Sequence, residues 1–322
     1  MKIIIKIKML SALFAVLVFN ACERRLLEDA YIETAVVQLH IDWSESGVSV
    51  DDMHRASIWL FPQNNGAALE FRLEGNLIYR EINVPIGVYS VLVFNETIDK
   101  DDWNNIIFTG TDSYETFAAM NVPKSEMGFY SRTKDLPLIG NPEAIAAWSL
   151  DRFEIMSKKS DIIEIKPLPR FERVAVTAYV SNLSGSMQAT GTINGMQGGV
   201  YMASGNRIAE PSAHSFILNG RVYDDNGKDG TTTRTFNIFG RLEEANHKIA
   251  IDFLLSNGTL HPSEEFDVNN LIVTETVEYV RTHFVNLGYG NLPDDRPITL
   301  PEGDMNAGII VDEWENVIIP IK

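Results

Sequence analysis

Residues 34–43 read TAVVQLHIDW, and from Val37 onward apolar and polar side chains alternate. The two sets are Val37, Leu39, Ile41 and Trp43 on one side and Gln38, His40 and Asp42 on the other. Successive side chains of a β-strand point to opposite faces of its sheet, so a period of two predicts a strand with one buried face. The folded part of the chain is therefore expected to start as β structure at Thr34.

Strand patterns of this kind recur along the rest of the chain, at a spacing of about ten residues. In the first half we expect strands at 55–61, 69–73, 77–84, 88–95, 106–109 and 162–165. In the second half we expect them at 174–180, 187–193, 215–222, 232–239, 248–255, 264–268, 277–284, 309–311 and 317–321. One exception is 142–148, where Pro142 and Glu143 are typical of a helix start and predict one or two helical turns. Short strands between turn residues predict an all-β sandwich or barrel.

Two prolines, Pro167 and Pro169, interrupt this series near its middle. Proline lacks the N–H that a sheet ladder needs, so strand pairing is expected to stop there. We therefore predict two β domains, residues 34–168 and 169–322. A chain of this length can bury proper cores, and with a single cysteine it can form no internal disulfide.

The residues before Thr34 do not follow the strand pattern. Lys2, Lys6 and Lys8 make a basic start, and an apolar run over residues 9–19 follows. This run is too short to cross a bilayer as a helix, but it fits a secretory signal peptide. Cys22, the sole cysteine of the 322-residue chain, stands just behind it.

This arrangement resembles the lipobox of bacterial lipoproteins, in which a cysteine thiol is acylated after export. The resemblance implies a signal peptide over residues 1–21, acyl chains such as palmitate on Cys22, and a polar tether over 22–33. Phe19 and Asn20 depart from the usual lipobox, which carries Leu three residues before the cysteine and a small residue two before it. The alternative is an ordinary signal peptide that leaves Cys22 as a free thiol, an unusual state outside the cytoplasm.

Acidic side chains outnumber basic ones, with 44 Asp and Glu against 27 Lys and Arg. The formal net charge is −17, and it becomes −20 once the three lysines of the signal are removed. Such a surface repels nucleic acid and anionic lipid headgroups, so we expect no nucleic-acid partner and attachment to the membrane through lipid alone. Since one acyl chain holds only weakly, stable attachment implies several chains on Cys22.

The sequence contains no pattern that indicates catalysis or a cofactor. The six histidines are His40, His54, His214, His247, His261 and His283, and none of them form the spaced pair of a helical zinc site. Residues 224–230 superficially resemble a calcium loop, but they lack its terminal glutamate and are expected to form a hairpin turn. No phosphate loop or nucleophile elbow occurs. We therefore expect no enzyme activity, no metal and no cofactor.

The five tryptophans are Trp43, Trp59, Trp103, Trp148 and Trp314. Trp43 and Trp59 lie in alternating strands and are expected in a core. Trp103 stands in the polar stretch 99–105, where an exposed ring would be able to stack on a sugar or a partner protein. We predict Trp103 as the platform for a ligand or partner.

Several short motifs, taken in order, resemble a known family. They are Ile41-Asp42-Trp43-Ser44, Ile58-Trp59-Leu60-Phe61-Pro62, Pro85-Ile86-Gly87-Val88-Tyr89, Thr111-Asp112-Ser113-Tyr114 and Met196-Gln197-Gly198-Gly199-Val200-Tyr201. Behind a lipoprotein cysteine, this series resembles the fimbrillin-related lipoproteins of Bacteroidetes-type bacteria, a group that contains fimbrial anchor subunits. The branch that it resembles is known only as a domain of unknown function.

The resemblance implies two consecutive β-sandwiches of transthyretin-like, Greek-key topology, held at the outer membrane by the acylated cysteine. It also implies a non-catalytic role in cell adhesion, as a fimbrial anchor or accessory subunit that engages pilus subunits through β-strand or sheet-edge contacts. Arg24 and Arg25 lie so close to Cys22 that cleavage there would only release the lipid, which favours an anchor over a shaft subunit. The cell surface and the periplasmic face both stay open as locations. The alternative function is a cell-surface glycan-binding lipoprotein that uses exposed aromatic side chains.

Overall fold

The computed structural model describes residues 33–64, 66–99, 103–123, 136–156, 161–263 and 265–293. The predicted signal peptide, Cys22, the tether up to residue 32 and the predicted strands at 309–311 and 317–321 lie outside these residues. Within the described part of the chain, no helix has both the length and the apolar character of a membrane span. The strands form four sheets, and the all-β class is confirmed.

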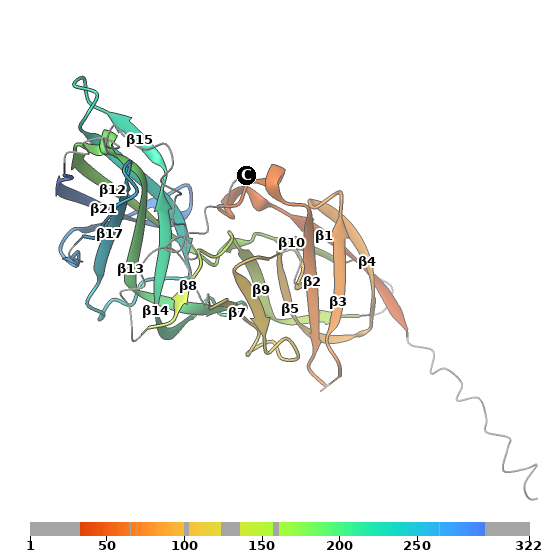
Figure 1. Ribbon diagram of the computed structural model, residues 1–322. Coiled ribbons are helices and arrows are strands. Elements are labelled where there is room, and N and C mark those ends of the chain that lie inside the picture. Colours follow the sequence, from red (N-terminus) through yellow and green to blue (C-terminus); the bar gives the residue numbers. More distant parts are fainter. Residues whose placement is uncertain are drawn as a thin grey trace, which may run out of the picture.

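Two of these sheets pack face to face as the first lobe (Figure 1). One has the spatial order β10 (Asp161–Ile165), β1 (Thr34–Ile41) and β4 (Tyr79–Pro85). The other has the order β11 (Leu168–Pro169), β9 (Ala146–Ile155), β5 (Gly87–Asn95), β2 (Arg55–Pro62) and β3 (Leu69–Glu74). Two short 3-10 helices, η1 (Trp43–Glu45) and η2 (Val50–Asp52), connect β1 to β2. Val37, Leu39 and Ile41 of β1 are buried in one core with Ile58 and Val91, as their alternation predicts.

The other two sheets form the second lobe. One has the order β15 (Gly220–Tyr223), β16 (Gly230–Ile238), β12 (Glu172–Ser181), β21 (Val280–Asn291) and β20 (Ile272–Val277). The other has the order β18 (Leu260–His261), β17 (Lys248–Leu255), β13 (Ser186–Tyr201), β14 (Arg207–Leu218) and β8 (Leu138–Ile139), with β19 (Phe266–Asp267) also paired to β17. The 3-10 helix η4 (Leu183–Gly185) connects β12 to β13. Residues 224–229 form the turn between β15 and β16, so the predicted hairpin turn is confirmed.

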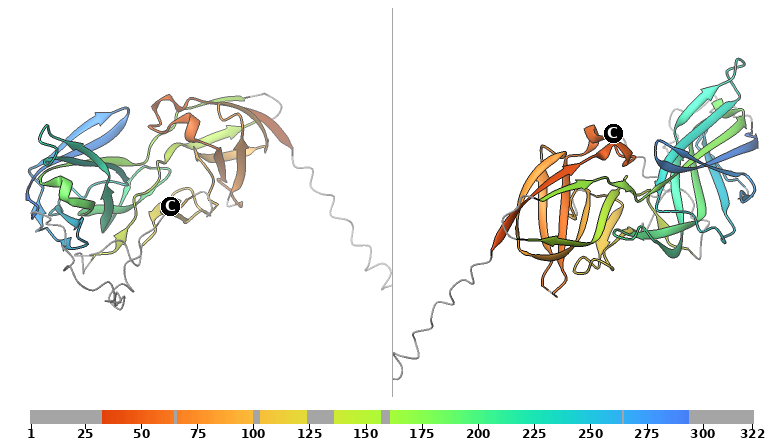
Figure 2. Two further views of the ribbon diagram at one scale, coloured as in Figure 1. Left: turned by 45° about the horizontal axis from the view of Figure 1, so that its top comes forward. Right: turned by 180° about the vertical axis from the view of Figure 1, so that it is seen from behind.

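A segment from the first half of the chain crosses into the second lobe. β6 (Ile106–Thr109) pairs with β7 (Ala118–Asn121), and β7 pairs with β13 through Met120 and Gly199. β8 then pairs with β14 before the chain returns to the first lobe as β9. Figures 1 and 2 show two distinct lobes in every view, and Figure 1 shows β8 beside β14 in the second. The expected strand at 106–109 is thus present, but it joins the second lobe rather than the first.

The helical turns expected at 142–148 do not form. β9 starts at Ala146 and pairs with β5, where Trp148 lies opposite Val93. The Asn95 side chain holds the start of this strand, because its Oδ1 accepts a hydrogen bond from the backbone N–H of Ala146 over 2.7 Å. Pairing with a neighbouring strand therefore outweighs the local helix signals of Pro142 and Glu143.

Candidate interaction surfaces

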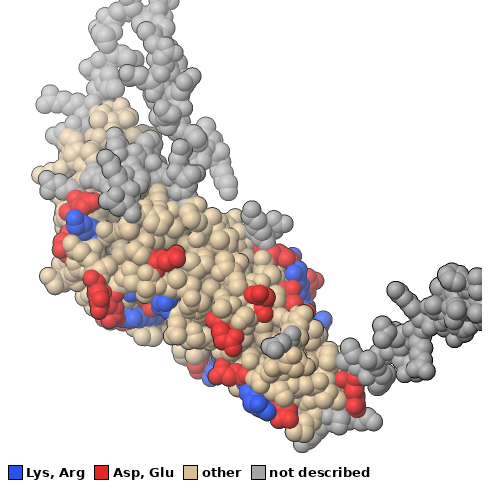
Figure 3. Space-filling model, turned by 90° about the horizontal axis from the view of Figure 1, so that it is seen from below, with Lys and Arg blue, Asp and Glu red and all other residues tan. Residues whose placement is uncertain are grey.

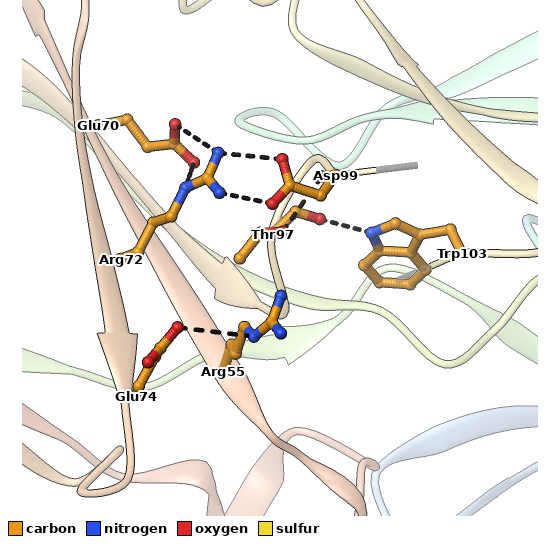
Figure 4. Close-up of polar contacts among 7 residues, drawn as sticks. All are labelled: Arg55, Glu70, Arg72, Glu74, Thr97, Asp99 and Trp103. Atoms are coloured by element: carbon orange, nitrogen blue, oxygen red, sulfur yellow. Dashed lines mark hydrogen bonds and ion pairs between the residues drawn. The ribbon is translucent and has the colours of Figure 1, made fainter. Parts of the chain in front are cut away.

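Trp103, the predicted platform, is buried, with 6 % of its surface exposed. Its indole Nε1 donates a hydrogen bond to the carbonyl oxygen of Thr97 (Figure 4), and Phe108 of β6 lies edge-on at a centroid distance of 5.5 Å. The platform prediction is therefore wrong. The polar loop suggested exposure, but the ring fills a core between the lobes that no local pattern reveals.

Ion pairs hold the loop that follows β5 against the edge strand β3 (Figure 4). Arg72 Nε lies 3.0 Å from Glu70 Oε1, and Arg72 Nη2 donates to Asp99 Oδ1 over 3.1 Å. These hydrogen bonds to Glu70 and Asp99 raise the pKa of Arg72. A further pair, Arg55 with Glu74, links β2 to β3 at 3.8 Å. The outer edge of β3 thus carries charges along its length, a device that discourages pairing with another chain.

A third hydrophobic core joins the two lobes. Its buried members are Trp59, Phe61, Leu92, Phe94, Trp103, Ile106, Tyr114, Phe117, Ala119, Ile145, Ala147, Val200, Met202, Ala203 and Phe239. Phe117, 0 % exposed, makes edge-on contacts with Trp59 at 5.2 Å and with Phe94 at 5.7 Å. We call this cluster the junction core. A continuous apolar core between two lobes favours a fixed relative orientation over independent motion.

Polar contacts surround the junction core. Ser149 Oγ of the first lobe donates to the carbonyl oxygen of Ala203 over 2.7 Å, and Arg170 Nε donates to that of Met202 over 3.0 Å. Arg207 in turn donates to the backbone carbonyl of Arg170. Burial, with the neighbouring charge of Arg207, lowers the pKa of Arg170 to about 10. These bonds tie the segment between the lobes to the turn that follows β13.

A buried carboxylate lies beside this junction at the start of β12. Glu172 Oε2 is 2.7 Å from His283 Nε2, and His283 Nδ1 is 2.8 Å from Thr274 Oγ1. Burial raises the pKa of Glu172, but the hydrogen bond with His283 and the charges of Arg207 and Arg281 outweigh it, so the net shift is downward. Carboxylate, imidazole and hydroxyl are the parts of a nucleophilic triad. Here Glu172 is 6 % and His283 1 % exposed, so the carboxylate and the imidazole are buried, and Thr274 alone is exposed.

The remaining histidines do not converge on a site. His40 forms an exposed pair with Glu164 at 2.6 Å, on the outer face of the first lobe. His214 is fully buried, both of its ring nitrogens lack a hydrogen-bond partner, and burial lowers its pKa to about 3. Among the described residues, no three His, Cys, Asp or Glu side chains are grouped so that they could hold a metal ion.

The edge strands of the two lobes differ in how they are protected. The edge strand β4 of the first lobe carries Arg80 and Glu81 and ends at Pro85, which lacks a backbone donor. The edge strand β20 of the second lobe reads IVTETV, with Glu275 as its one charge. It pairs with β21 without a register shift, and within the described chain no strand pairs with its other side. An edge rich in β-branched residues, without proline or lysine, is a template for a further strand.

The sequence analysis did not identify β20. It predicted one strand over 277–284, whereas the chain reverses at Glu278 and Tyr279, with φ angles of 47° and 67°. Glycine and asparagine are the usual residues at such angles, so this hairpin lacks its ordinary signal. The β-branched run 272–277 was the signal that would have located the strand. Val273 is 54 % exposed on it, and Tyr279 is 57 % exposed at the turn.

The chain matches the family model described as a domain of unknown function, DUF5119, over residues 21–216. It belongs to this family. The match starts beside Cys22, covers the first lobe and extends into β14, and it confirms the resemblance to a branch of unknown function. No curated protein matches the DUF5119 chain.

Solved structures are similar to this chain. A candidate adhesin of Bacteroides ovatus has a TM-score of 0.58 and 18 % identity, over 85 % of the DUF5119 chain and 95 % of its own. The fimbrial anchor protein Mfa2 of Porphyromonas gingivalis has a TM-score of 0.47 and 13 % identity, over 79 % and 90 % of the two chains. At 18 % identity, the similarity to the Bacteroides ovatus structure shows the fold alone, and that fold agrees with the predicted pair of β-sandwiches.

Proposed function

We propose that this DUF5119 protein is a non-catalytic outer-membrane lipoprotein that serves as a fimbrial anchor or accessory subunit. Acyl chains on Cys22 hold it in the membrane, residues 22–33 form the tether, and the outer edge of β20 receives a strand from a partner subunit. The observation that carries the proposal is this six-residue edge, which has one charge and no proline or lysine. The candidate adhesin of Bacteroides ovatus, which shares the fold, supports a role in adhesion.

Strand addition needs a backbone that is free to pair and side chains that select the partner. Main-chain hydrogen bonds supply the affinity in such contacts, and alternate side chains supply the specificity. Val273 and Val277 are 54 % and 38 % exposed, so they offer an apolar surface beside the edge. The junction core would transmit a pull on β20 to the first lobe and so to the tether.

The edge proposal is tested by adding lysines, which protect natural edge strands from pairing. We expect Thr276→Lys with Val277→Lys to abolish co-purification of other surface subunits from membranes, as measured by quantitative mass spectrometry. Both side chains are exposed, so the free energy of unfolding should change by no more than about 0.5 kcal/mol. The matched control is Tyr79→Lys with Asn83→Lys on the already charged edge β4, which should keep the partners. Equal retention by both variants would show that β20 is not the contact.

The anchor is tested separately with Cys22→Ala. We expect the wild-type chain to sediment with membranes and the variant to stay in the supernatant, because the net acidic charge of the chain is repelled by anionic headgroups. Mass spectrometry of the N-terminal peptide measures the acyl chains directly. Sedimentation of Cys22→Ala with membranes would refute the lipid anchor and leave the β20 contact untouched.

A further inference from the structure

The outer surface of the sheet β15-β16-β12-β21-β20 carries an unusual set of side chains. Val174, Val176 and Ala178 of β12 point into the core, so the residues between them point outward. The registers of β12 with β16 and with β21 align these outward side chains in rows across three strands. The centre of this surface, which we call the threonine face, consists of Thr177, Tyr179, Thr231, Thr233, Phe284 and Asn286.

The centre of the threonine face carries no charged side chain in a strongly acidic protein, and the Asp224 carboxylate lies at its margin, beside the Tyr179 hydroxyl. On the described strands β12, β16 and β21, no Asp, Glu, Lys or Arg holds an outward position between the row of Tyr179 and that of Arg173. The outer face of the first lobe differs, because Glu81 lies opposite Gln38 there and Glu164 opposite His40. Acidic groups are also spread along the face that Figure 3 shows. A neutral surface of this kind suits a neutral partner and gives no attraction to a polyanion.

Two aromatic side chains belong to the threonine face, the exposed Tyr179 and the half-buried Phe284. Tyr179, 42 % exposed, lies opposite Gly288, where even a Cβ atom would meet nothing within 4 Å. Phe284 lies opposite Ala175 on the same pair of strands. Four residues separate the two rows, which is about 13 Å along a strand. The Tyr179 hydroxyl donates to Asp224 Oδ2 over 3.0 Å, so this ring is already held in place.

Hydroxyl and amide groups fill the space between the two rings. Thr177 lies between Thr233 on one neighbouring strand and Asn286 on the other. Hydroxyls both donate and accept hydrogen bonds, and the amide of asparagine does the same. The two rings stand apart, with hydroxyl and amide groups between them, whereas the centre of a protein interface is a continuous apolar patch. Sugars present C–H surfaces for aromatic rings and hydroxyls for polar groups, and they match both features.

We propose that the threonine face binds a neutral, extended polysaccharide. Tyr179 and Phe284 stack on separate sugar rings, and Thr177, Thr233 and Asn286 hydrogen-bond to the hydroxyls between them. Two rings fixed on a sheet lose little conformational freedom on binding, so the contact area is gained at low entropic cost.

The test is affinity electrophoresis of the full-length chain in detergent, in native gels that contain yeast mannan, soluble starch or arabinoxylan, with hyaluronate as the anionic comparison. We expect at least one neutral polysaccharide to slow the wild-type chain and hyaluronate to leave it unchanged. Tyr179→Ala and Phe284→Ala should each raise the Kd by about tenfold or more. Tyr79→Ala, which removes a ring 45 % exposed on β4, is the matched control and should bind as the wild type does.

Thr233→Asp provides a second variant that leaves both rings in place and adds a charge at the centre of the face. It should abolish the retardation, with an unfolding midpoint close to that of the wild type. The proposal is overturned if none of the three neutral polysaccharides slows the chain, if hyaluronate alone does, or if all face variants migrate as the wild type does. The β20 lysine variants should bind the polysaccharide normally, which separates this site from the edge contact.

Discussion

The two lobes share a sandwich architecture, but they use their outer surfaces in different ways. In the first lobe, β2 and β5 are buried on both faces, because Ile58 and Val91 enter its own core while Trp59 and Leu92 enter the junction core. Its edges carry charges or proline. In the second lobe, one sheet keeps the centre of its outer face uncovered, and its edge strand β20 carries a single charge and no proline.

We propose that this difference separates support from recognition within a single chain. The first lobe packs both faces of β2 and β5 and carries charged side chains on the outer face of β10-β1-β4, which suits a part that connects a tether to the rest of the molecule. The second lobe leaves a neutral face and a strand edge available for contact. The following changes test that division, from the largest expected effect to the smallest.

Phe117→Ala should cause the largest loss, because it empties the centre of the junction core. Removing a fully buried phenylalanine costs about 3–5 kcal/mol of unfolding free energy. We also expect urea unfolding to separate into two steps, since the lobes would no longer stabilise one another. Tyr79→Ala, an exposed ring on β4, should change the free energy by no more than about 0.5 kcal/mol. A loss below about 1 kcal/mol for Phe117→Ala would show that the lobes are independent.

His214→Leu should stabilise the second lobe, because it removes a buried imidazole whose nitrogens have no partner. Leaving such groups unsatisfied costs about 1–3 kcal/mol. The gain should grow in acid. Since burial lowers the pKa of His214 from 6.5 to about 3, the unfolded chain takes up a proton that the folded chain refuses. The proton-linked loss of folding stability caused by His214 is therefore absent above about pH 6.5. It grows by up to ~1.4 kcal/mol per pH unit as the pH drops toward 3.

Urea unfolding at pH 7.5 and pH 4.5 measures this contribution. His214→Leu should flatten the dependence between the two values, whereas His54→Leu, which removes an exposed imidazole, should leave it in place. An unchanged slope in His214→Leu would show that the imidazole gains a partner or a proton inside the fold.

Arg72→Ala should have the smallest effect on stability. It removes the ion pairs with Glu70 and Asp99 at the edge of β3, and exposed pairs of this kind contribute about 0–1 kcal/mol. This variant also compares the two edge strands, because it removes the positive charge of Arg72 from β3 and leaves β20 unchanged. Thermal unfolding measures the stability, and co-purification measures the partners. A new partner gained by Arg72→Ala would show that charge alone kept β3 closed.

Alternation of apolar and polar residues predicted the strands that bury one face in a single core. Val37, Leu39 and Ile41 face one core, and their period of two is visible without knowledge of the partner strands. The pattern failed where distant segments decide the outcome. Pro142 and Glu143 signal a helix, yet pairing with β5 places a strand at Ala146.

The candidate site was harder to predict than the fold for the same reason. The sequence placed Trp103 in a polar loop, but β6 and the start of the second lobe bury it. The threonine face is not visible as a motif, because its members come from three strands far apart in the sequence and only the register brings them together. The hairpin between β20 and β21 has no sequence signal, because Tyr279 adopts a positive φ angle at a position where glycine or asparagine is usual.

The crossing of β6, β7 and β8 has a consequence for how the chain can be divided. Met120 of β7 pairs with Gly199 of β13, and Ile139 of β8 pairs with His214 of β14. Strands β7 and β8 therefore cannot complete their pairing until β13 and β14 have been synthesised. A chain cut near residue 168 would leave the β6–β7 hairpin without a sheet and the second lobe without three of its strands, β6, β7 and β8. Because the lobes share strands and the junction core, we expect neither lobe to fold as a separate module.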